Sequence, residues 1–271
     1  MTKELEMKTS LLDCENKHMF VHMKRSGGHA IINWLIQQTR RHSLFVNNVN
    51  PVPLPKLDKK SLLWSLRRGS YFYLYKKSKH EKTETTLRWR ENLAERTHSF
   101  NCDLVFSYEH IPLERLKNFD KINNIKTYKY LILRDPFNWM SSLFSRDKKF
   151  SYSESEGGHR TFAEDSIKNW KMCAREYLKD SEFININYNE WFTSQEYRKN
   201  LCEKLNLEFT DRGFLEVPSA GTGSSFDGIK YDKKSSSMKV LERYKQFDIS
   251  EYVDEELIYY GKRIFDIEWK K

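Results

Sequence analysis

One stretch of the chain, residues 18–35, combines the patterns of a strand, a basic glycine loop and a helix. Residues 18–23 form an apolar run of strand length, and apolar side chains recur at helical spacing over 31–36. The loop between them consists of Lys24, Arg25, Ser26, Gly27, Gly28 and His29. This order aims backbone N–H groups and a helix N-terminus at an anion, and the glycines permit a close approach. The stretch predicts a phosphate-binding loop, with an ordinary turn as the alternative.

Strand and helix patterns alternate along the rest of the chain. Strands are expected at 43–46, 102–107, 128–133 and 183–187, and helices at 113–119, from Pro136 onward, and at 162–178, 195–205, 237–246 and 254–263. This alternation predicts an α/β fold, a single P-loop-like domain over residues 1–271 with a central, mainly parallel sheet flanked by helices on both faces.

Composition narrows the ligand class. The chain has 271 residues, with 47 Lys+Arg against 38 Asp+Glu, and its formal charge of +9 favours a polyanionic ligand, an acidic acceptor or nucleic acid. Four scattered cysteines form no zinc-binding pattern, so no metal site and a reduced compartment are expected. The charged N-terminus and the lack of a long apolar stretch predict a cytoplasmic protein without a membrane span.

Two segments are candidates for contact with a second ligand. Aromatic and basic residues interleave from Trp64 to Lys82, inside an insertion at about residues 50–98. Three interpretations of this segment remain open. A half-buried element with a basic edge is favoured, followed by an acceptor-binding insertion and then by a nucleic-acid patch. Residues 151–160 form a polar stretch with two glycines, which is a candidate lid.

Polar side chains follow four of the predicted strands. They are Lys24 to Ser26, Glu109 with His110, Arg134, and Tyr188. Ligands in an open parallel sheet bind at the carboxyl ends of strands, so these side chains mark a candidate site. The Arg134 guanidinium offers a planar fork for a phosphate, and Ser142, eight residues later, lies about two turns along the helix that Pro136 begins.

Taken together, these segments resemble the sulfotransferases that use 3′-phosphoadenosine 5′-phosphosulfate (PAPS), in particular the bacterial-type members. Residues 24–29 are similar to the family's 5′-phosphosulfate loop, although Arg25 stands where lysine is usual and Gly28-His29 where two hydroxyl residues are usual. Arg134 with Ser142 is similar to the family's 3′-phosphate site. The resemblance covers roughly residues 20–247, through short segments in the family's order.

The same resemblance supplies candidates for the remaining roles. Residues 108–112 are similar to the segment that carries the catalytic base, which makes His110 the candidate base and Glu109 the alternative. An imidazole with a pKa near ~6.5 can accept a hydroxyl proton at neutral pH. Tyr188 resembles the tyrosine that approaches the adenine. Residues 221–228 resemble a late loop that replaces the family's Arg-Lys-Gly loop, which leaves Ser224, Ser225 and Lys230 as alternative phosphate contacts.

The resemblance implies transfer of a sulfuryl group from PAPS to a hydroxyl or amine, leaving the bisphosphate product PAP. Arg25, supported by Lys24, would stabilise the departing oxygen. The rings and cations of 61–98 would suit a glycan as the acceptor, and neither nucleic acid nor a membrane is an expected partner. A P-loop kinase that uses ATP is the first alternative, but no Lys-Ser/Thr pair follows Gly27-Gly28. A non-catalytic nucleic-acid-binding protein is the second alternative.

Overall fold

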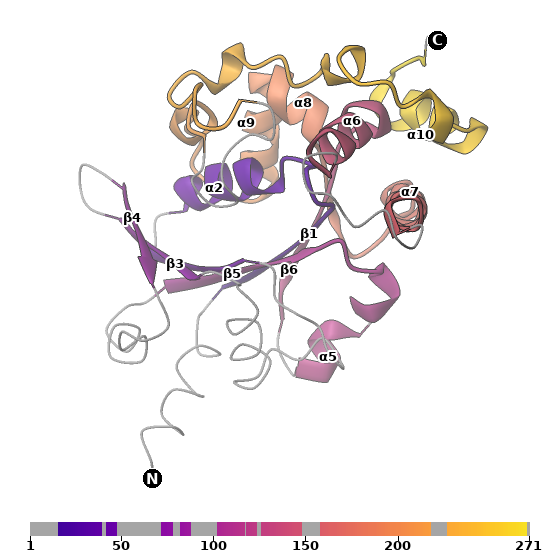
Figure 1. Cartoon of the computed structure of the whole chain (residues 1–271). Helices are drawn as coiled ribbons and strands as arrows, with labels where there is room; N and C mark the ends of the chain where they lie inside the picture. Colours follow the sequence, from indigo (N-terminus) through magenta and orange to yellow (C-terminus); the bar gives the residue numbers. More distant parts are fainter. Residues whose placement is uncertain are drawn as a thin grey trace. The chain divides into compact units, whose positions relative to one another are not determined.

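The computed structural model describes residues 16–39, 42–47, 72–77, 82–87, 102–116, 118–123, 126–147, 158–217 and 227–269 (Figure 1). The chain divides into two compact units. The first is formed by Met1–Val21 and Thr39–Tyr130, and the second by His22–Gln38 and Leu131–Lys271. Among the described helices, none combines the length and the apolar character needed to cross a bilayer.

The strands of the described residues form a sheet in the order β4-β3-β2-β5-β1-β6-β7. The strands are β1 (Lys17–His22), β2 (His42–Val46), β3 (Phe72–Lys77), β4 (Lys82–Leu87), β5 (Cys102–Glu109), β6 (Tyr128–Leu133) and β7 (Ile184–Asn187). Its centre is parallel, with Val46 of β2 opposite Phe106 of β5, whereas β3 and β4 add antiparallel pairs at one end. Helices flank this sheet, which confirms the predicted α/β class with a mainly parallel sheet.

The first unit has an aromatic core behind its strands. Phe20 of β1 stacks on Tyr130 of β6 with ring centroids 4.4 Å apart. Phe106 and Tyr108 of β5 pack on Phe119, the first residue of helix α5 (Phe119–Asn123). A short 3-10 helix, η1 (Leu113–Leu116), precedes α5, so the helix expected over 113–119 is two separate turns of chain.

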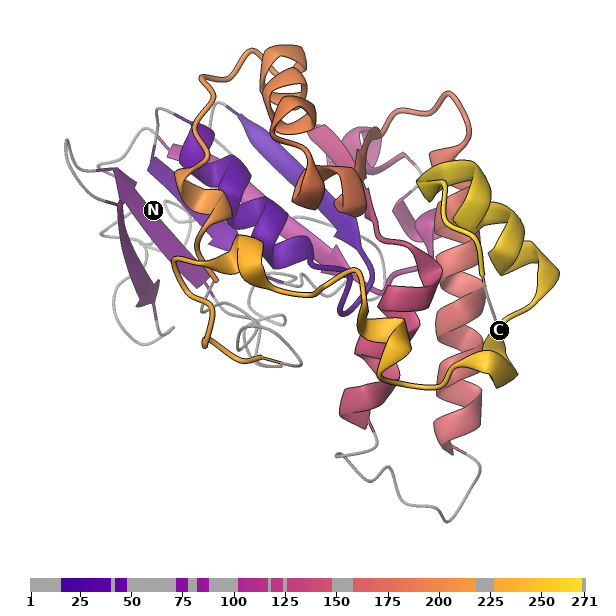
Figure 2. The ribbon, with the colours of Figure 1, turned by 90° about the horizontal axis from the view of Figure 1, so that it is seen from above.

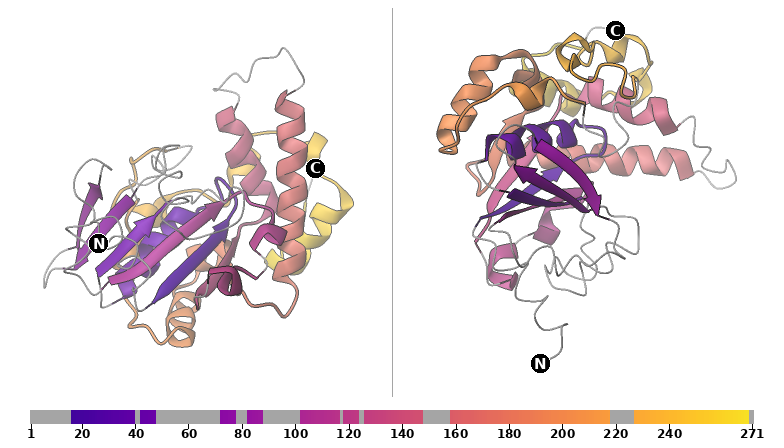
Figure 3. Two further views of the ribbon diagram at one scale, coloured as in Figure 1. Left: turned by 90° about the horizontal axis from the view of Figure 1, so that it is seen from below. Right: turned by 90° about the vertical axis from the view of Figure 1, so that its left-hand side faces the viewer.

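The predicted insertion contains the β3–β4 hairpin, whose two strands face the viewer in the right panel of Figure 3. The hairpin has Phe72 opposite Leu87 and Lys77 opposite Lys82. Trp64, Arg67 and Lys79 lie outside the described residues, as do 151–157 of the candidate lid. The role of the insertion in acceptor binding therefore stays a prediction.

The second unit is mainly helical. Its α-helices are α2 (Gly28–Gln38), α6 (Pro136–Asp147), α7 (Gly158–Tyr177), α8 (Tyr188–Thr193), α9 (Gln195–Lys204) and α10 (Glu255–Phe265). Figures 2 and 3 show α6 and α7 side by side, where Trp139 stacks on Trp170. Side chains cap three of the helices, because oxygens of Asn187, Ser194 and Asp254 accept N–H groups at the starts of α8, α9 and α10.

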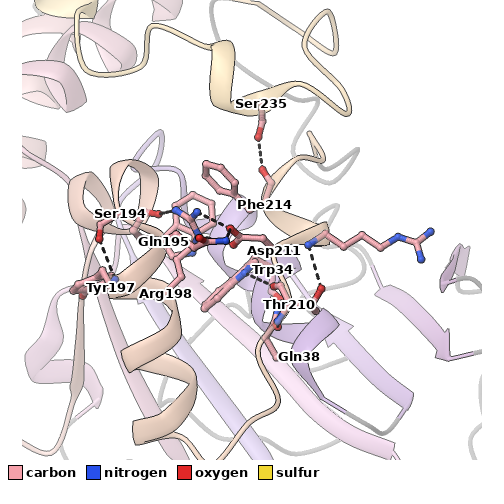
Figure 4. A network of polar contacts seen from close by, with 12 residues as sticks. Trp34, Gln38, Ser194, Gln195, Tyr197, Arg198, Thr210, Asp211, Phe214 and Ser235 are labelled. Carbon is pink, nitrogen blue, oxygen red and sulfur yellow. Dashed lines mark hydrogen bonds and ion pairs between the residues drawn. The ribbon is translucent and has the colours of Figure 1, made fainter.

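An ion pair between a buried arginine and a partly exposed aspartate supports the segment that anchors helix α2, which follows the glycine loop (Figure 4). Arg198 of α9 donates to both carboxylate oxygens of Asp211, at 2.7 and 2.9 Å, and its guanidinium lies 3.8 Å from the Phe214 ring. The adjacent Thr210 accepts a hydrogen bond from the Trp34 indole and donates its N–H to Gln38, both on α2. The segment around residues 210–214 thus fixes the helix whose N-terminus adjoins the candidate phosphate loop.

The helix expected over 237–246 is wrong. Two 3-10 turns, η4 (Ser235–Ser237) and η5 (Arg243–Lys245), stand there with irregular chain between them. Backbone groups that a helix would pair internally are paired instead with side chains of α6 and of Arg134, two residues before it: the Arg243 N–H donates to Asn138, and the Val240 carbonyl accepts from Arg134. Tertiary hydrogen bonds have replaced the helical ones, which periodicity cannot reveal.

Candidate anion-binding site

The loop between β1 and α2 is a tight turn with left-handed residues. The Ser26 N–H donates to the Met23 carbonyl at 3.2 Å, Arg25 has φ +65° and Gly27 has φ +83°. Two carbonyls of the turn are held by the β6–α6 segment, since the Trp139 indole donates to Lys24 at 2.9 Å and Arg134 donates to Arg25 at 3.3 Å. With these carbonyls engaged elsewhere and the Ser26 N–H donating within the turn, the N–H groups at the start of α2 are the groups positioned to meet an anion.

Ser26 presents a hydroxyl inside this turn. Its side chain is 1% exposed, and within the described residues its Oγ has no hydrogen-bond partner. A buried hydroxyl without a partner costs free energy that a bound acceptor would recover. A ligand oxygen at the loop would supply that acceptor.

Two side chains press against the glycines of the loop. A Cβ added at Gly27 would lie 2.1 Å from Cε2 of Tyr188, and one added at Gly28 would lie 2.5 Å from the His22 ring. Both positions therefore require glycine for packing, and Gly27 also requires it for its φ. Tyr188 is the first residue of α8 and is 5% exposed, with its ring 5.1 Å from Cζ of Arg134.

Arg134 is buried beside the loop, immediately after β6. Its guanidinium donates to the Arg25 carbonyl, to Ser142 Oγ at 3.0 Å and to the Val240 carbonyl. Burial lowers the pKa of Arg134, while Tyr188 and Asp135 oppose that effect. The Asp135 carboxylate is bound by the side-chain amides of Asn138 and Asn189. The three oxygens that accept from Arg134 are all neutral.

A second guanidinium, that of Arg243, converges on the same serine. It donates to Ser142 Oγ at 3.1 Å and lies 3.5 Å from an oxygen of Asp227. Burial, and then the positive charge of Arg134, lower the pKa of Arg243 to about 10. Two partly desolvated cations on one hydroxyl form a site that a multiply charged anion would stabilise.

Sequence reasoning missed Arg243. The sequence predicted a phosphate contact from Ser224, Ser225 or Lys230, and the two serines lie outside the described residues. Lys230 is exposed and lies 5.6 Å from the Tyr231 ring. Nothing in the local sequence separates Arg243 from the other basic residues, because its importance comes from the fold that carries it to Ser142.

Two imidazoles flank the loop, one at the end of β1 and one at the start of α2. His29, in the first turn of α2, meets the ring of His22 edge-on, with centroids 5.5 Å apart. His22 Nδ1 lies 3.2 Å from the Met23 carbonyl, and since a carbonyl only accepts, Nδ1 is the donor. Of these two residues, His29 is the one at a position where the resembling family usually has a hydroxyl residue.

The two candidate bases belong to the first unit. Glu109 is the last residue of β5 and His110 follows it, and both are partly buried. His110 has φ +58°, a left-handed conformation that is uncommon outside glycine but that histidine, asparagine and aspartate adopt more often than other residues. The second unit holds the other described candidates: Lys24, Arg25, Ser26, Gly27, Gly28, His29, Arg134, Ser142 and Tyr188.

Comparisons with known proteins add two structural likenesses. No family model matches the chain, and no curated protein matches it. Mouse sulfotransferase SULT7A1 complexed with PAP has 13% identity and a TM-score of 0.49, covering 95% of this chain and 90% of that one. The sulfotransferase domain from the curacin biosynthetic pathway has the same identity and TM-score, covering 91% of this chain and 96% of that one. At this identity and TM-score, neither likeness bears on the activity of this chain.

Proposed function

We propose that this chain is a PAPS-dependent sulfotransferase that transfers a sulfuryl group to an acceptor hydroxyl. The observation that carries the proposal is the pair of buried guanidiniums, Arg134 and Arg243, which share Ser142 one hydrogen bond away from the glycine loop. The second unit thus holds two neighbouring clusters of donors. A nucleotide with separate phosphates at its 3′ and 5′ positions matches that arrangement.

The residues present fit such a nucleotide. Ser26 offers a buried donor that lacks a partner among the described residues, and the start of α2 offers N–H groups for the 5′ end. Arg134 and Arg243 offer two guanidiniums whose pKa values are already lowered by burial, so a dianion would relieve their desolvation. PAPS, when bound, supplies the sulfuryl group that the acceptor receives.

Each group of the chain then has a distinct task. The turn at Ser26 and Gly27 binds the 5′ end, and Arg25 with Lys24 supplies positive charge where the departing oxygen becomes negative. Arg134 and Arg243 hold the 3′-phosphate and so orient the nucleotide. His110 accepts the proton of the acceptor hydroxyl, with Glu109 as the alternative base. A glycan is the acceptor class that the aromatic and basic insertion would suit.

Calorimetric titration tests the proposal. Adenosine 3′,5′-bisphosphate (PAP) should bind at least tenfold more tightly than ADP, because a second phosphate in the 3′ position gains charge-assisted hydrogen bonds of about 1.5–3 kcal/mol each. A kinase that uses ATP predicts the opposite order. Equal affinities, or a preference for ADP, would overturn the proposal.

A further inference from the structure

The segment that carries Arg243 is irregular, yet one side chain holds it. Between η4 and η5, the Leu241 carbonyl accepts from Asn138 Nδ2 at 3.1 Å. The N–H groups of Arg243 and Tyr244 both donate to Asn138 Oδ1, at 2.8 and 3.3 Å. We call residues 241–244 the strap. A single side-chain amide from helix α6 therefore binds three backbone groups of the strap.

The orientation of that amide is fixed from the other side. Asn138 is 1% exposed, and its Nδ2 also donates to the Asp135 carboxylate at 3.1 and 3.2 Å. Asp135 is in turn bound by Asn189 Nδ2 at 3.0 Å. Because Oδ1 faces two donors and Nδ2 faces acceptors, a flipped amide would lose every one of these bonds. These hydrogen bonds fix both the position of the Asn138 amide and the direction in which its oxygen points.

Ser142 lies one turn further along the same helix, and the hydrogen and both lone pairs of its hydroxyl are engaged in hydrogen bonds. Its hydroxyl donates to the Asn138 carbonyl at 2.8 Å, and its oxygen accepts from Arg134 at 3.0 Å and from Arg243 at 3.1 Å. A hydroxyl has one hydrogen and two lone pairs, so in this arrangement it has no hydrogen left for a phosphate. Ser142 bridges the two guanidiniums and does not itself donate to a ligand.

Two like charges that share one hydroxyl repel each other, and after burial the charge of Arg134 is the next cause that lowers the pKa of Arg243. Ser142 and the Asp227 carboxylate contact the guanidinium of Arg243, and Asn138 holds the backbone from which that side chain extends. We propose that Asn138 is the positioning residue for the 3′-phosphate: by clipping the strap to α6 it keeps Arg243 beside Arg134, and so sets the preference for 3′-phosphorylated nucleotides. This inference rests on the proposed function.

The test compares PAP with adenosine 5′-monophosphate (AMP), which lacks only the 3′-phosphate. For each variant, titration gives the ratio of the dissociation constant of AMP to that of PAP, which measures the preference for the 3′-phosphate. Asn138→Ala should lower that ratio about tenfold or more by weakening PAP, with AMP affinity changed less than about twofold. Arg243→Ala should do the same, and the double variant should show little further loss because both changes remove one interaction.

Two further variants separate positioning from general stability. Asn138→Gln keeps both the donor and the acceptor of the amide, so it should retain more of the ratio than Asn138→Ala even if both variants lose thermal stability. Asn185→Ala is the matched control, since the Asn185 side-chain amide also donates a hydrogen bond to a backbone carbonyl, that of Tyr177 at 2.7 Å, and Asn185 lies outside the strap. It should lower thermal stability and leave the ratio unchanged.

The outcomes are distinct. If wild-type protein binds PAP and AMP equally, the proposed function fails, and this inference fails with it. If wild-type protein prefers PAP, but Asn138→Ala keeps the preference or weakens both nucleotides alike, only the role of Asn138 is overturned. The role of Asn138 would also be overturned if the double variant lowered the ratio by the product of the two single effects, because Asn138 would then act independently of Arg243.

Discussion

The guanidinium of Arg134 donates a hydrogen bond to the carbonyl of Arg25 across 3.3 Å, although 109 residues separate the two in the chain. This bond joins the end of β6 to the turn before α2. One nitrogen of Arg134 serves both this carbonyl and Ser142, so the residue that would hold a 3′-phosphate also fixes the loop for the 5′ end. The two donor clusters are therefore joined directly by a hydrogen bond.

Arg134→Lys tests that double role. Lysine keeps the charge but replaces a planar fork that reaches three oxygens with a single point donor. We expect PAP affinity to fall about 10- to 100-fold, corresponding to one charge-assisted hydrogen bond of about 1.5–3 kcal/mol. Titration calorimetry measures it. Arg175→Lys, which changes an exposed arginine on α7 paired with Glu256, is the control and should leave the affinity as it was. An unchanged affinity for Arg134→Lys would contradict the assignment.

Gly27→Ala should destabilise the protein and abolish nucleotide binding together. Left-handed backbone costs a residue with a Cβ about 1–2 kcal/mol, and the new methyl would overlap the Tyr188 ring, which adds about 1–3 kcal/mol. Denaturant unfolding measures the sum. Gly228→Ala is the matched control, since Gly228 also has positive φ but nothing lies within 4 Å of its added Cβ, so only the backbone cost should remain. Equal losses in the two variants would show that packing on Tyr188 contributes nothing.

The buried strands and the residues at which helices begin are predictable from this sequence, whereas the conformation of the strap is not. The apolar run at 128–133 and the proline at 136 locate β6 and the start of α6, because burial and the missing proline N–H act locally. Residues 237–246 carry an apolar spacing typical of a helix, yet Asn138 and Arg134 take up their backbone groups. Such hydrogen bonds depend on residues about a hundred positions away, so no local pattern reveals them or the position of Arg243.

His110→Asn tests the proposed base. Asparagine tolerates left-handed backbone better than most residues, so it should keep the conformation at φ +58° while removing the titratable ring. We expect turnover to fall about 10²- to 10⁴-fold with PAP affinity nearly unchanged. The measurement is transfer of radiolabelled sulfate from PAPS to a panel of carbohydrate acceptors. Glu109→Gln serves as the comparison. A large loss in Glu109→Gln with none in His110→Asn would assign the base to Glu109.

His18 should make the protein less stable in acid. Its ring stacks with Tyr128 and Tyr130 and shares a hydrogen bond with the Tyr130 hydroxyl at 3.0 Å, and burial lowers its pKa to about 4 from an ordinary 6.5. Between these two values the unfolded chain binds a proton that the folded chain does not. The free energy of unfolding therefore falls as pH is lowered through this window, by up to about 3 kcal/mol. Denaturant unfolding of wild type and His18→Phe at pH 7 and pH 4.5 isolates this contribution, since phenylalanine keeps an aromatic ring for stacking but cannot take up a proton. The variant should lose less stability than wild type over that range, and equal losses would mean that His18 is as easily protonated in the folded protein as in the unfolded chain.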